Sequence, residues 1–289
     1  MGWLGVSNAR LLTAWLPEID HLDDVRLRRF VTVALSQSLR PSSRWLIGSV
    51  KATADPARMP IPLDQSLRRW ARQLARDCVA EQDAHAATGD VFGAARQRGQ
   101  IQHGDARALP IADASVDAIV TSPPYFVTYD YFDVQRLSYL AFGWPVQRTD
   151  QVGAKYGLEP TDRQVGLPPA LRSWYEDQYR GERTVLGRAL RTYVEDLRTH
   201  FAEAARVIAP GGVVAYSVAN TVRAGRVFDL AEAFRQLLVE AKFADVQAVP
   251  RQQSGRRILP AGRDVQSGRF ARDTSNAGVR EYIVFATRR

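Results

Sequence analysis

The residues with the most distinctive chemistry form a short stretch that directly follows an apolar run. Residues 116–126 read VDAIVTSPPYF, so Ser122, Pro123, Pro124 and Tyr125 come straight after a strand-like sequence. Because proline cannot donate a hydrogen bond to a sheet ladder, the strand is expected to end before the prolines. The two rings would hold an extended backbone, with the Pro123 carbonyl pointing outward. The sequence therefore predicts a rigid tip at the carboxyl end of a strand, where ligands bind in open α/β sheets.

Two oxygen atoms on this tip could recognise an amino group. The Ser122 hydroxyl and the Pro123 carbonyl are both acceptors, and the exocyclic NH2 group of a nucleobase offers two donors. Acceptors that draw on both hydrogens favour a pyramidal nitrogen, whose lone pair can then attack a sulfonium methyl group. Tyr125 adds a flat face for stacking, worth about 1–3 kcal/mol per base. A base in a duplex would have to flip out to reach such a pocket. The alternative is an ordinary loop with a chance Ser-Pro-Pro-Tyr sequence.

Composition and charge favour a nucleic-acid partner. The 289 residues include 39 Lys and Arg against 31 Asp and Glu, a formal net charge of +8. Arginine supplies almost all of this positive charge, and its guanidinium group forms forked hydrogen bonds with phosphates. A GC-rich genome would also raise the arginine content. With 45% hydrophobic residues, the chain is expected to bury a sizeable core.

Cysteine and histidine contents argue against a metal centre. The single cysteine, Cys78, supports neither a disulfide framework nor a cysteine zinc site. His21, His85, His103 and His200 lie far apart, without the spacing of metal ligands. No apolar run is long enough to span a bilayer and no basic-then-apolar leader is present, so a soluble, cytoplasmic protein is expected.

The elements that must position the tip alternate between strand and helix patterns. Short apolar runs and amphipathic stretches follow one another at 116–120, 184–208, 213–220, 227–243, 244–249 and 281–287. This alternation predicts a mostly parallel α/β sheet, with the last run as a candidate antiparallel edge strand. Residues 101–111 are expected to form a short strand and turn. Gly211 and Gly212 are expected to stop the preceding helix.

The first part of the chain has a different pattern. Residues 1–99 are predicted to be a helical region, with amphipathic helices at 23–39 and 64–80. Residues 100–289 would then carry the sheet and the candidate site. An irregular, charge-balanced insert at 145–183 interrupts them and is a candidate for reading bases.

A basic loop at 251–272 is the candidate for binding DNA phosphates. It carries six arginines and one aspartate between two predicted strands. The predicted phosphate contacts are Arg251, Arg256, Arg257, Arg263, Arg269 and Arg272. The alternative is a solvated loop without a ligand.

These motifs resemble those of the DNA amino-methyltransferases, which methylate adenine N6 or cytosine N4. TSPPY (121–125) matches their catalytic motif, and GDARALP (104–110), APGG (209–212) and REYIVFA (280–286) occur in the same order. The resemblance covers roughly residues 100–145 and 184–289. It implies part of a class I methyltransferase domain with a Rossmann-like sheet that uses S-adenosylmethionine as its cofactor.

The resemblance also implies roles for individual residues. Ser122, where other members have Asp or Asn, is most frequent in cytosine-N4 enzymes. Asp105 would lie near the cofactor's adenine amine, with Thr121 also at the cofactor site. The alternative for Asp105 is a solvated turn residue.

The cofactor-binding half of that family has no counterpart in this sequence. It needs a strand, a Gly-rich turn where the backbone can approach the cofactor, and a second strand that ends in an acid. We therefore expect a DNA methyltransferase subunit that is inactive alone and receives the Gly-rich half from a partner chain. The substrate would be double-stranded DNA. An RNA amino-methyltransferase and a non-catalytic nucleic-acid-binding scaffold are the alternatives.

Overall fold

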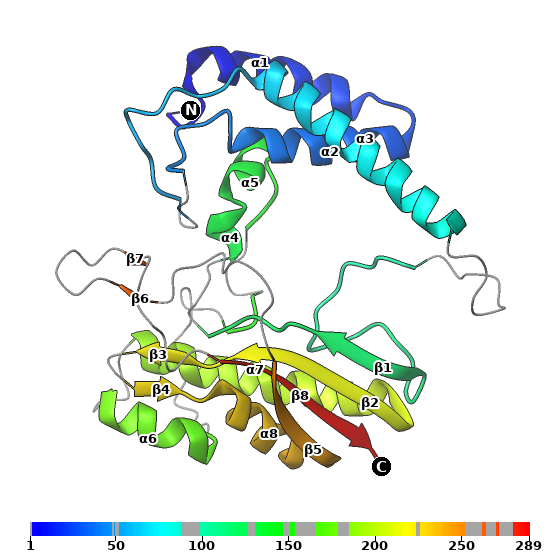
Figure 1. Ribbon diagram of the computed structural model, residues 1–289, viewed down its shortest axis with the longest axis vertical. Coiled ribbons are helices and arrows are strands. Elements are labelled where there is room, and N and C mark those ends of the chain that lie inside the picture. The colour runs from blue at the N-terminus through cyan, green and yellow to red at the C-terminus, as the bar shows by residue number, and fades with distance from the viewer. Residues whose placement is uncertain are drawn as a thin grey trace. The chain divides into compact units, whose positions relative to one another are not determined.

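The computed structural model describes residues 2–47, 49, 52–87, 99–126, 131–146, 151–153, 166–178, 185–223, 226–251, 262–263, 270–271 and 280–289. The chain divides into two compact units (Figure 1). Each unit has its own hydrophobic core. The helical unit comprises Met1–Ile101 and Asp130–Val146, and the sheet unit comprises Gln102–Tyr129 and Gln147–Arg289.

In its described residues, the helical unit contains three long helices and two short ones. They are α1 (Gly5–Asp20), α2 (Val25–Leu39), α3 (Leu63–Ala87), α4 (Tyr131–Val134) and α5 (Arg136–Phe142). The predicted helices at 23–39 and 64–80 are confirmed as α2 and α3. The Asp24 side chain caps α2 by accepting hydrogen bonds from the backbone N–H groups of Arg26 and Leu27. No described helix of the chain is both long and apolar enough to cross a membrane.

The core of the helical unit joins the loop after α2 to the helices. Leu35, Leu63 and Trp45 are almost fully buried, and Leu137 of α5 packs into the same cluster. Asn8 of α1 is also buried, and it bonds to three separate backbone groups. Its amide donates to the carbonyls of Ser42 and Ile61, and its oxygen accepts from the Leu63 N–H. Because its polar atoms are satisfied, this buried amide stabilises the packing of the loop.

The described part of the sheet unit is built around a mixed sheet of four strands. Its strands are β1 (Val116–Thr121), β2 (Ile208–Ala219), β5 (Phe243–Arg251) and β8 (Glu281–Arg288). The order is β1-β2-β8-β5. Among these described strands, β1 and β2 are the only neighbours that run parallel to each other. The predicted α/β class is confirmed, but the expectation of a mostly parallel sheet was wrong, because β8 lies antiparallel to both its neighbours.

Helices and short strand pairs complete the sheet unit. They are α6 (Pro169–Gln178), α7 (Val185–Val207), α8 (Leu230–Glu240), the pair β3 (Thr221–Arg223) and β4 (Arg226–Phe228), and the pair β6 (Gly262–Arg263) and β7 (Phe270–Ala271). In Figure 1, α7 and α8 lie along one face of the sheet. The predicted helices at 184–208 and 227–243 are therefore confirmed. α8 is shorter than expected, because β4 precedes it and Asp229 caps its first turn.

The last strand has the predicted direction but a different position. β8 is antiparallel, as expected, yet it lies between β2 and β5 and is paired along both edges. Val284 and Ala286 of this strand are completely buried. The alternation of strands and helices predicts which segments are strands. It does not predict their order, which depends on how the hydrophobic faces pack.

Most of the core of the sheet unit lies between the sheet and the helices α7 and α8. Val214, Tyr216 and Val218 of β2 are completely buried. They belong to one apolar cluster with Leu190, Val194, Leu197, Phe201, Phe234, Leu237 and Leu238 from α7 and α8. Burying a large apolar side chain contributes about 1.5–3 kcal/mol, so this cluster is the main source of stability in the unit.

The opposite face of the sheet is more exposed. Val120 of β1 is 81% exposed, Val213 of β2 40% and Val249 of β5 46%. Alternate residues of a strand point to opposite faces, and Val120 pairs with Ala215, two residues from Val213. Val120 and Val213 therefore share this open, apolar face.

Gly211 and Gly212 have a different role from the predicted one. α7 ends at Val207, before either glycine, so they do not stop the helix. They lie inside β2, where the pairing with β1 shifts between Val116 and Ala118. Gly211 has a φ of +81°, and a Cβ on Gly212 would lie 2.8 Å from the Asp117 carbonyl oxygen. The glycines therefore make a bulge in the ladder, which requires a residue without a side chain.

The predicted strand at 101–111 was also wrong. In this segment the structure has a turn closed by a bridge between Asp105 and Ala108. The backbone of the segment bonds to side chains of α7 instead of to a neighbouring strand.

Candidate active site

The Ser-Pro-Pro-Tyr sequence forms a tip at the carboxyl end of β1. The strand ends at Thr121, which pairs with Tyr216 of the parallel strand β2. This confirms that the strand stops before the prolines. Ser122 is exposed, Pro123 is buried and Tyr125 is half-buried. The carboxyl ends of β1 and β2 meet at one edge of the sheet, so the end of β2 can contribute to the same site.

Three oxygen atoms cluster at the tip. The Ser122 hydroxyl donates to the Ser217 carbonyl of β2 at 3.4 Å, and the Tyr125 hydroxyl lies 3.5 Å from the same carbonyl. The Ser122 and Tyr125 hydroxyls are 3.3 Å apart. These contacts are long for O–H···O hydrogen bonds, so a ligand could replace them at small cost. A serine hydroxyl oxygen carries two lone pairs, so the Ser122 oxygen can accept from an amine while its O–H donates elsewhere.

The two proline carbonyls of the tip are in different environments. The Pro124 carbonyl accepts a hydrogen bond of 2.9 Å from the hydroxyl of Tyr193, a buried residue of α7. The Pro123 carbonyl accepts no hydrogen bond from the described residues. Phe126 follows the tip and packs on Tyr193, with ring centroids 5.5 Å apart. Helix α7 thus anchors the tip through Pro124, while the carbonyl of the buried Pro123 has no hydrogen-bond partner among the described residues.

One predicted DNA contact lies beside this tip. Arg251, at the end of β5, donates to the Ser217 hydroxyl at 3.4 Å and lies 3.8 Å from the Glu281 carboxylate. Ser217 therefore contacts Ser122 and Tyr125 through its carbonyl, and Arg251 through its side chain. The structure does not describe the side chains of the other predicted arginines. Only the backbone of Arg263 is described, and Arg256, Arg257, Arg269 and Arg272 lie outside the described residues.

Asp105 is held by a neighbouring arginine. The Arg107 guanidinium donates to both Asp105 carboxylate oxygens, at 3.0 and 2.7 Å, and also donates to Asp196 of α7 at 2.8 Å. This hydrogen bonding lowers the pKa of Asp105. The carboxylate is therefore charged and fixed on its turn. A cofactor amine at Asp105 would have to share it with Arg107. Thr121, the other predicted cofactor residue, is half-buried in the β1 ladder.

A row of polar residues on α7 holds the segment that contains Asp105. Asp196, His200, Glu203 and Arg206 are three or four residues apart and so lie on one face of the helix. The row bonds to backbone groups of residues 106–111.

Three of its members make the backbone contacts. His200 bonds to the Ala106 carbonyl at 2.9 Å, Glu203 accepts from the Leu109 N–H at 2.7 Å, and Arg206 donates to the Leu109 carbonyl at 3.0 Å. Arg206 also lowers the pKa of Glu203 to about 2 by hydrogen bonding. These bonds replace the strand ladder that was expected from the sequence.

His200 also connects this segment to the strand next to the tip. Its Nδ1–H must donate to the Ala106 carbonyl, so Nε2 accepts the Tyr216 hydroxyl proton, at 2.9 Å. Burial lowers the pKa of His200, which favours this neutral form. Burial also raises the pKa of Tyr216.

The predicted insert contributes one described contact near the tip. The Gly153 N–H donates to the Asp196 carboxylate at 2.8 Å, and the Tyr193 ring lies against Gly153. α6, which also belongs to this insert, buries Leu171 in the core of the sheet unit. Among the described residues, no group of three or more His, Cys, Asp or Glu side chains could hold a metal ion.

Sequence reasoning missed Tyr193, Ser217 and the polar row of α7. The row left a signal, because charged residues recur at helical spacing beside the apolar face of a long helix. Ser217 left none, since its contact with Ser122 spans 95 residues and depends on the register of β1 against β2.

Comparison with known proteins gives little further information. No known protein family and no curated protein matches this chain. Three solved structures of TTHA0409 from Thermus thermophilus, a proposed DNA modification methylase, align with 64% of this chain, and one is complexed with S-adenosyl-L-methionine. Identities are 17–19% and TM-scores 0.31–0.33, with 52–53% of that protein covered. The chain thus spans about half the length of TTHA0409, and a likeness at this TM-score carries no argument about function.

Proposed function

We propose that this chain is the catalytic subunit of a site-specific DNA methyltransferase. It would direct methyl transfer from S-adenosylmethionine to an exocyclic amine of a flipped base. The observation that carries the proposal is the tip at the end of β1. There the Ser122 hydroxyl is exposed and the Pro123 carbonyl has no partner among the described residues, while Tyr193 fixes the neighbouring Pro124 carbonyl.

The residues of this chain would prepare the amine for attack. One N–H donates to the Ser122 oxygen and the other to the Pro123 carbonyl, which aligns the nitrogen lone pair away from the base ring. The Tyr125 ring stacks on the base and orients it. S-adenosylmethionine would supply a sulfonium methyl group on the open side of the nitrogen.

The described residues do not form a full cofactor site. The Asp105 carboxylate is engaged by Arg107, and the sequence has no Gly-rich turn after a strand. The described residues therefore fit the amine side of the reaction but not the cofactor side. We assign the cofactor side to a partner chain.

The open edge of β1 supports a partner chain. Among the described strands, β1 pairs only with β2, although strands in parallel pairs are ordinarily buried within a sheet. Its free N–H and C=O groups, together with the exposed Val120, form a surface that further strands could cover. An obligate interface of this kind would bury more than about 2,000 Å².

Cytosine N4 is the preferred target, on the resemblance of the SPPY sequence alone. Both amines present the same two donors, so the hydrogen bonding of the tip does not separate them. Double-stranded DNA is the proposed substrate.

Mass spectrometry of nucleosides tests this function. DNA from cells that express the chain together with its neighbouring genes should contain N4-methylcytosine, and DNA from cells with the Tyr125→Ala chain should contain far less of it. N6-methyladenine alone would overturn the cytosine preference. If RNA is methylated and DNA is unmodified, the substrate is RNA instead of DNA. If no methylated nucleoside is found with any of the neighbouring genes, the catalytic role is overturned.

A further inference from the structure

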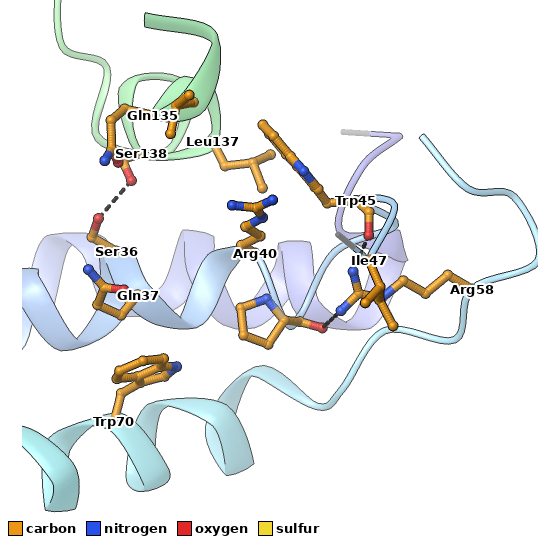
Figure 2. A pocket seen from close by; sticks show the side chains of 12 residues that line it. Ser36, Gln37, Arg40, Trp45, Ile47, Arg58, Trp70, Gln135, Leu137 and Ser138 are labelled. Atoms are coloured by element: carbon orange, nitrogen blue, oxygen red, sulfur yellow. Dashed lines mark hydrogen bonds between the residues drawn. The ribbon is translucent and has the colours of Figure 1, made fainter. Parts of the chain in front are cut away.

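The helical unit contains a pocket that the proposed methyl transfer does not use. It has a volume of about 340 Å³, within the lower range of small-ligand pockets, about 300–1,000 Å³. Figure 2 shows its wall, which α2, the following loop, α3 and α5 build together. The twelve lining residues include two arginines, Arg40 and Arg58, and no acidic residue.

Backbone carbonyls hold both arginines in place. Arg40 donates to the Ser49 carbonyl, and its guanidinium lies over the Trp45 ring, 4.8 Å from the ring centroid. Arg58 donates to the carbonyls of Trp45 and Pro41. Neither guanidinium pairs with a carboxylate in the part of the chain that the structure describes. Among the described residues, no acidic group therefore compensates either positive charge at the pocket.

The two positive charges also act on each other. Partial burial and the proximity of Arg58 lower the pKa of Arg40. Like charges in a partly desolvated pocket repel, and a bound anion would relieve that repulsion. Phosphate suits this position best, because guanidinium groups bind its oxygens through paired hydrogen bonds.

The rest of the wall suits a flat heterocycle. Trp45 is almost fully buried beneath Arg40, whereas Trp70 of α3 is half-exposed and lines the pocket. The amides of Gln37 and Gln135 are exposed at the same wall, and each offers donors and an acceptor. An aromatic face and two amides are the groups that recognise a nucleobase.

We infer that this pocket binds a nucleotide, with its phosphate on Arg40 and Arg58 and its base on Trp70. The nucleotide could be a unit of a DNA strand or a free mononucleotide, because both present the same phosphate and base. The inference does not depend on methyl transfer.

Titration of the full chain with defined probes tests the inference without S-adenosylmethionine. The probes are dAMP, dCMP, inorganic phosphate, a short single strand and a short duplex. Calorimetry measures the binding of each probe. Arg40→Gln/Arg58→Gln should weaken binding by at least about tenfold. The matched control Arg26→Gln/Arg29→Gln, which removes the same charge from α2 outside the pocket, should change it less than about twofold.

The probes separate the two sources of the nucleotide. Mononucleotide binding that the double variant removes indicates a free ligand, and binding of oligonucleotides alone indicates a strand. Trp70→Leu should weaken dAMP binding more than phosphate binding. If Trp70→Leu weakens dAMP binding and phosphate binding equally, Trp70 does not contact the base.

A second measurement covers the case in which the double variant does not fold. In the wild-type chain, the preferred probe should slow amide hydrogen exchange in residues 36–47 and 52–58 more than in α1. The inference would be overturned if no probe binds, or if the double variant and its control lose the same affinity. It would also be overturned if hydrogen exchange at these residues does not change.

Discussion

β1 and β8 are apolar strands of one sheet, in different environments. β8 is paired along both edges, and its Val284 is completely buried. Among the described strands β1 is paired only with β2, and its Val120 is 81% exposed. The candidate active site lies at the end of β1. Among the described strands the sheet is thus closed around β8 and open at β1, the strand that carries the proposed chemistry and the proposed partner interface.

The largest expected effect comes from placing a charge on the open strand. Val120→Arg should change the free energy of unfolding of the isolated chain by less than about 0.5 kcal/mol, because the side chain is already exposed. It should weaken association with the partner by at least about 100-fold, because an unpaired charge would be buried in the interface. Chemical denaturation and calorimetry of the complex measure the two effects.

Two substitutions serve as references for this prediction. Val79→Arg, at a 54% exposed position of α3, should leave both quantities unchanged. Val284→Arg should unfold the sheet unit, because it buries a charge in the core. Normal assembly and methylation by Val120→Arg would exclude the open face of β1 from the interface.

The tip itself should show the next largest effect. Tyr125→Ala should lower the single-turnover methylation rate of the assembled enzyme by about 100-fold, because the base loses its stacking surface and orientation. DNA affinity should stay within a few-fold. Ser122→Ala should lose less activity than Tyr125→Ala, because the Pro123 carbonyl remains as an acceptor. A wild-type methylation rate in Tyr125→Ala would show that the tip does not form the base pocket.

The bond between His200 and Tyr216 tests how firmly the Asp105 segment is tied to the sheet. His200→Leu should lower the free energy of unfolding by about 1–3 kcal/mol, because the buried Tyr216 hydroxyl loses its acceptor. Adding Tyr216→Phe should recover part of that loss, since it removes the unsatisfied hydroxyl. Urea unfolding of the single and double variants gives the coupling energy, and additive losses would contradict the bond.

The same pair predicts a pH dependence. The pKa of folded His200 is lowered by burial, against raising effects of the Ala106 carbonyl and Glu203. Its contribution to stability is therefore complete above about pH 6.5 and is lost as the pH falls through the lower folded pKa. The double variant should lack this decline. Glu203, with a pKa of about 2, acts in a separate window below about pH 4.5.

The smallest expected effect concerns the arginine beside the tip. Arg251→Gln should lower DNA affinity equally on all sequences and reduce the slope of log affinity against log salt by about 1. Arg289→Gln removes the same charge outside the site and should leave the slope unchanged. An unchanged slope in Arg251→Gln would exclude a phosphate contact at this residue.

The sequence predicted elements better than their arrangement. Helical periodicity located α2, α3 and α7, and the two prolines located the end of β1, because these signals act over a few residues. The position of β8 and the contact of Ser217 with Ser122 depend on packing between distant segments. Gly212 shows the same limit, because the need for glycine there arises from the close Asp117 carbonyl of another strand.

Gly153 has a consequence for how far this protein can vary. Its φ is +70°, and a Cβ there would lie 2.5 Å from the Tyr193 ring, while its N–H bonds to Asp196. Tyr193 in turn holds the Pro124 carbonyl of the tip. A substitution at residue 153 would therefore strain the backbone and press on the ring that anchors the tip. Homologues could vary other parts of the insert to change specificity, but they should keep glycine at position 153.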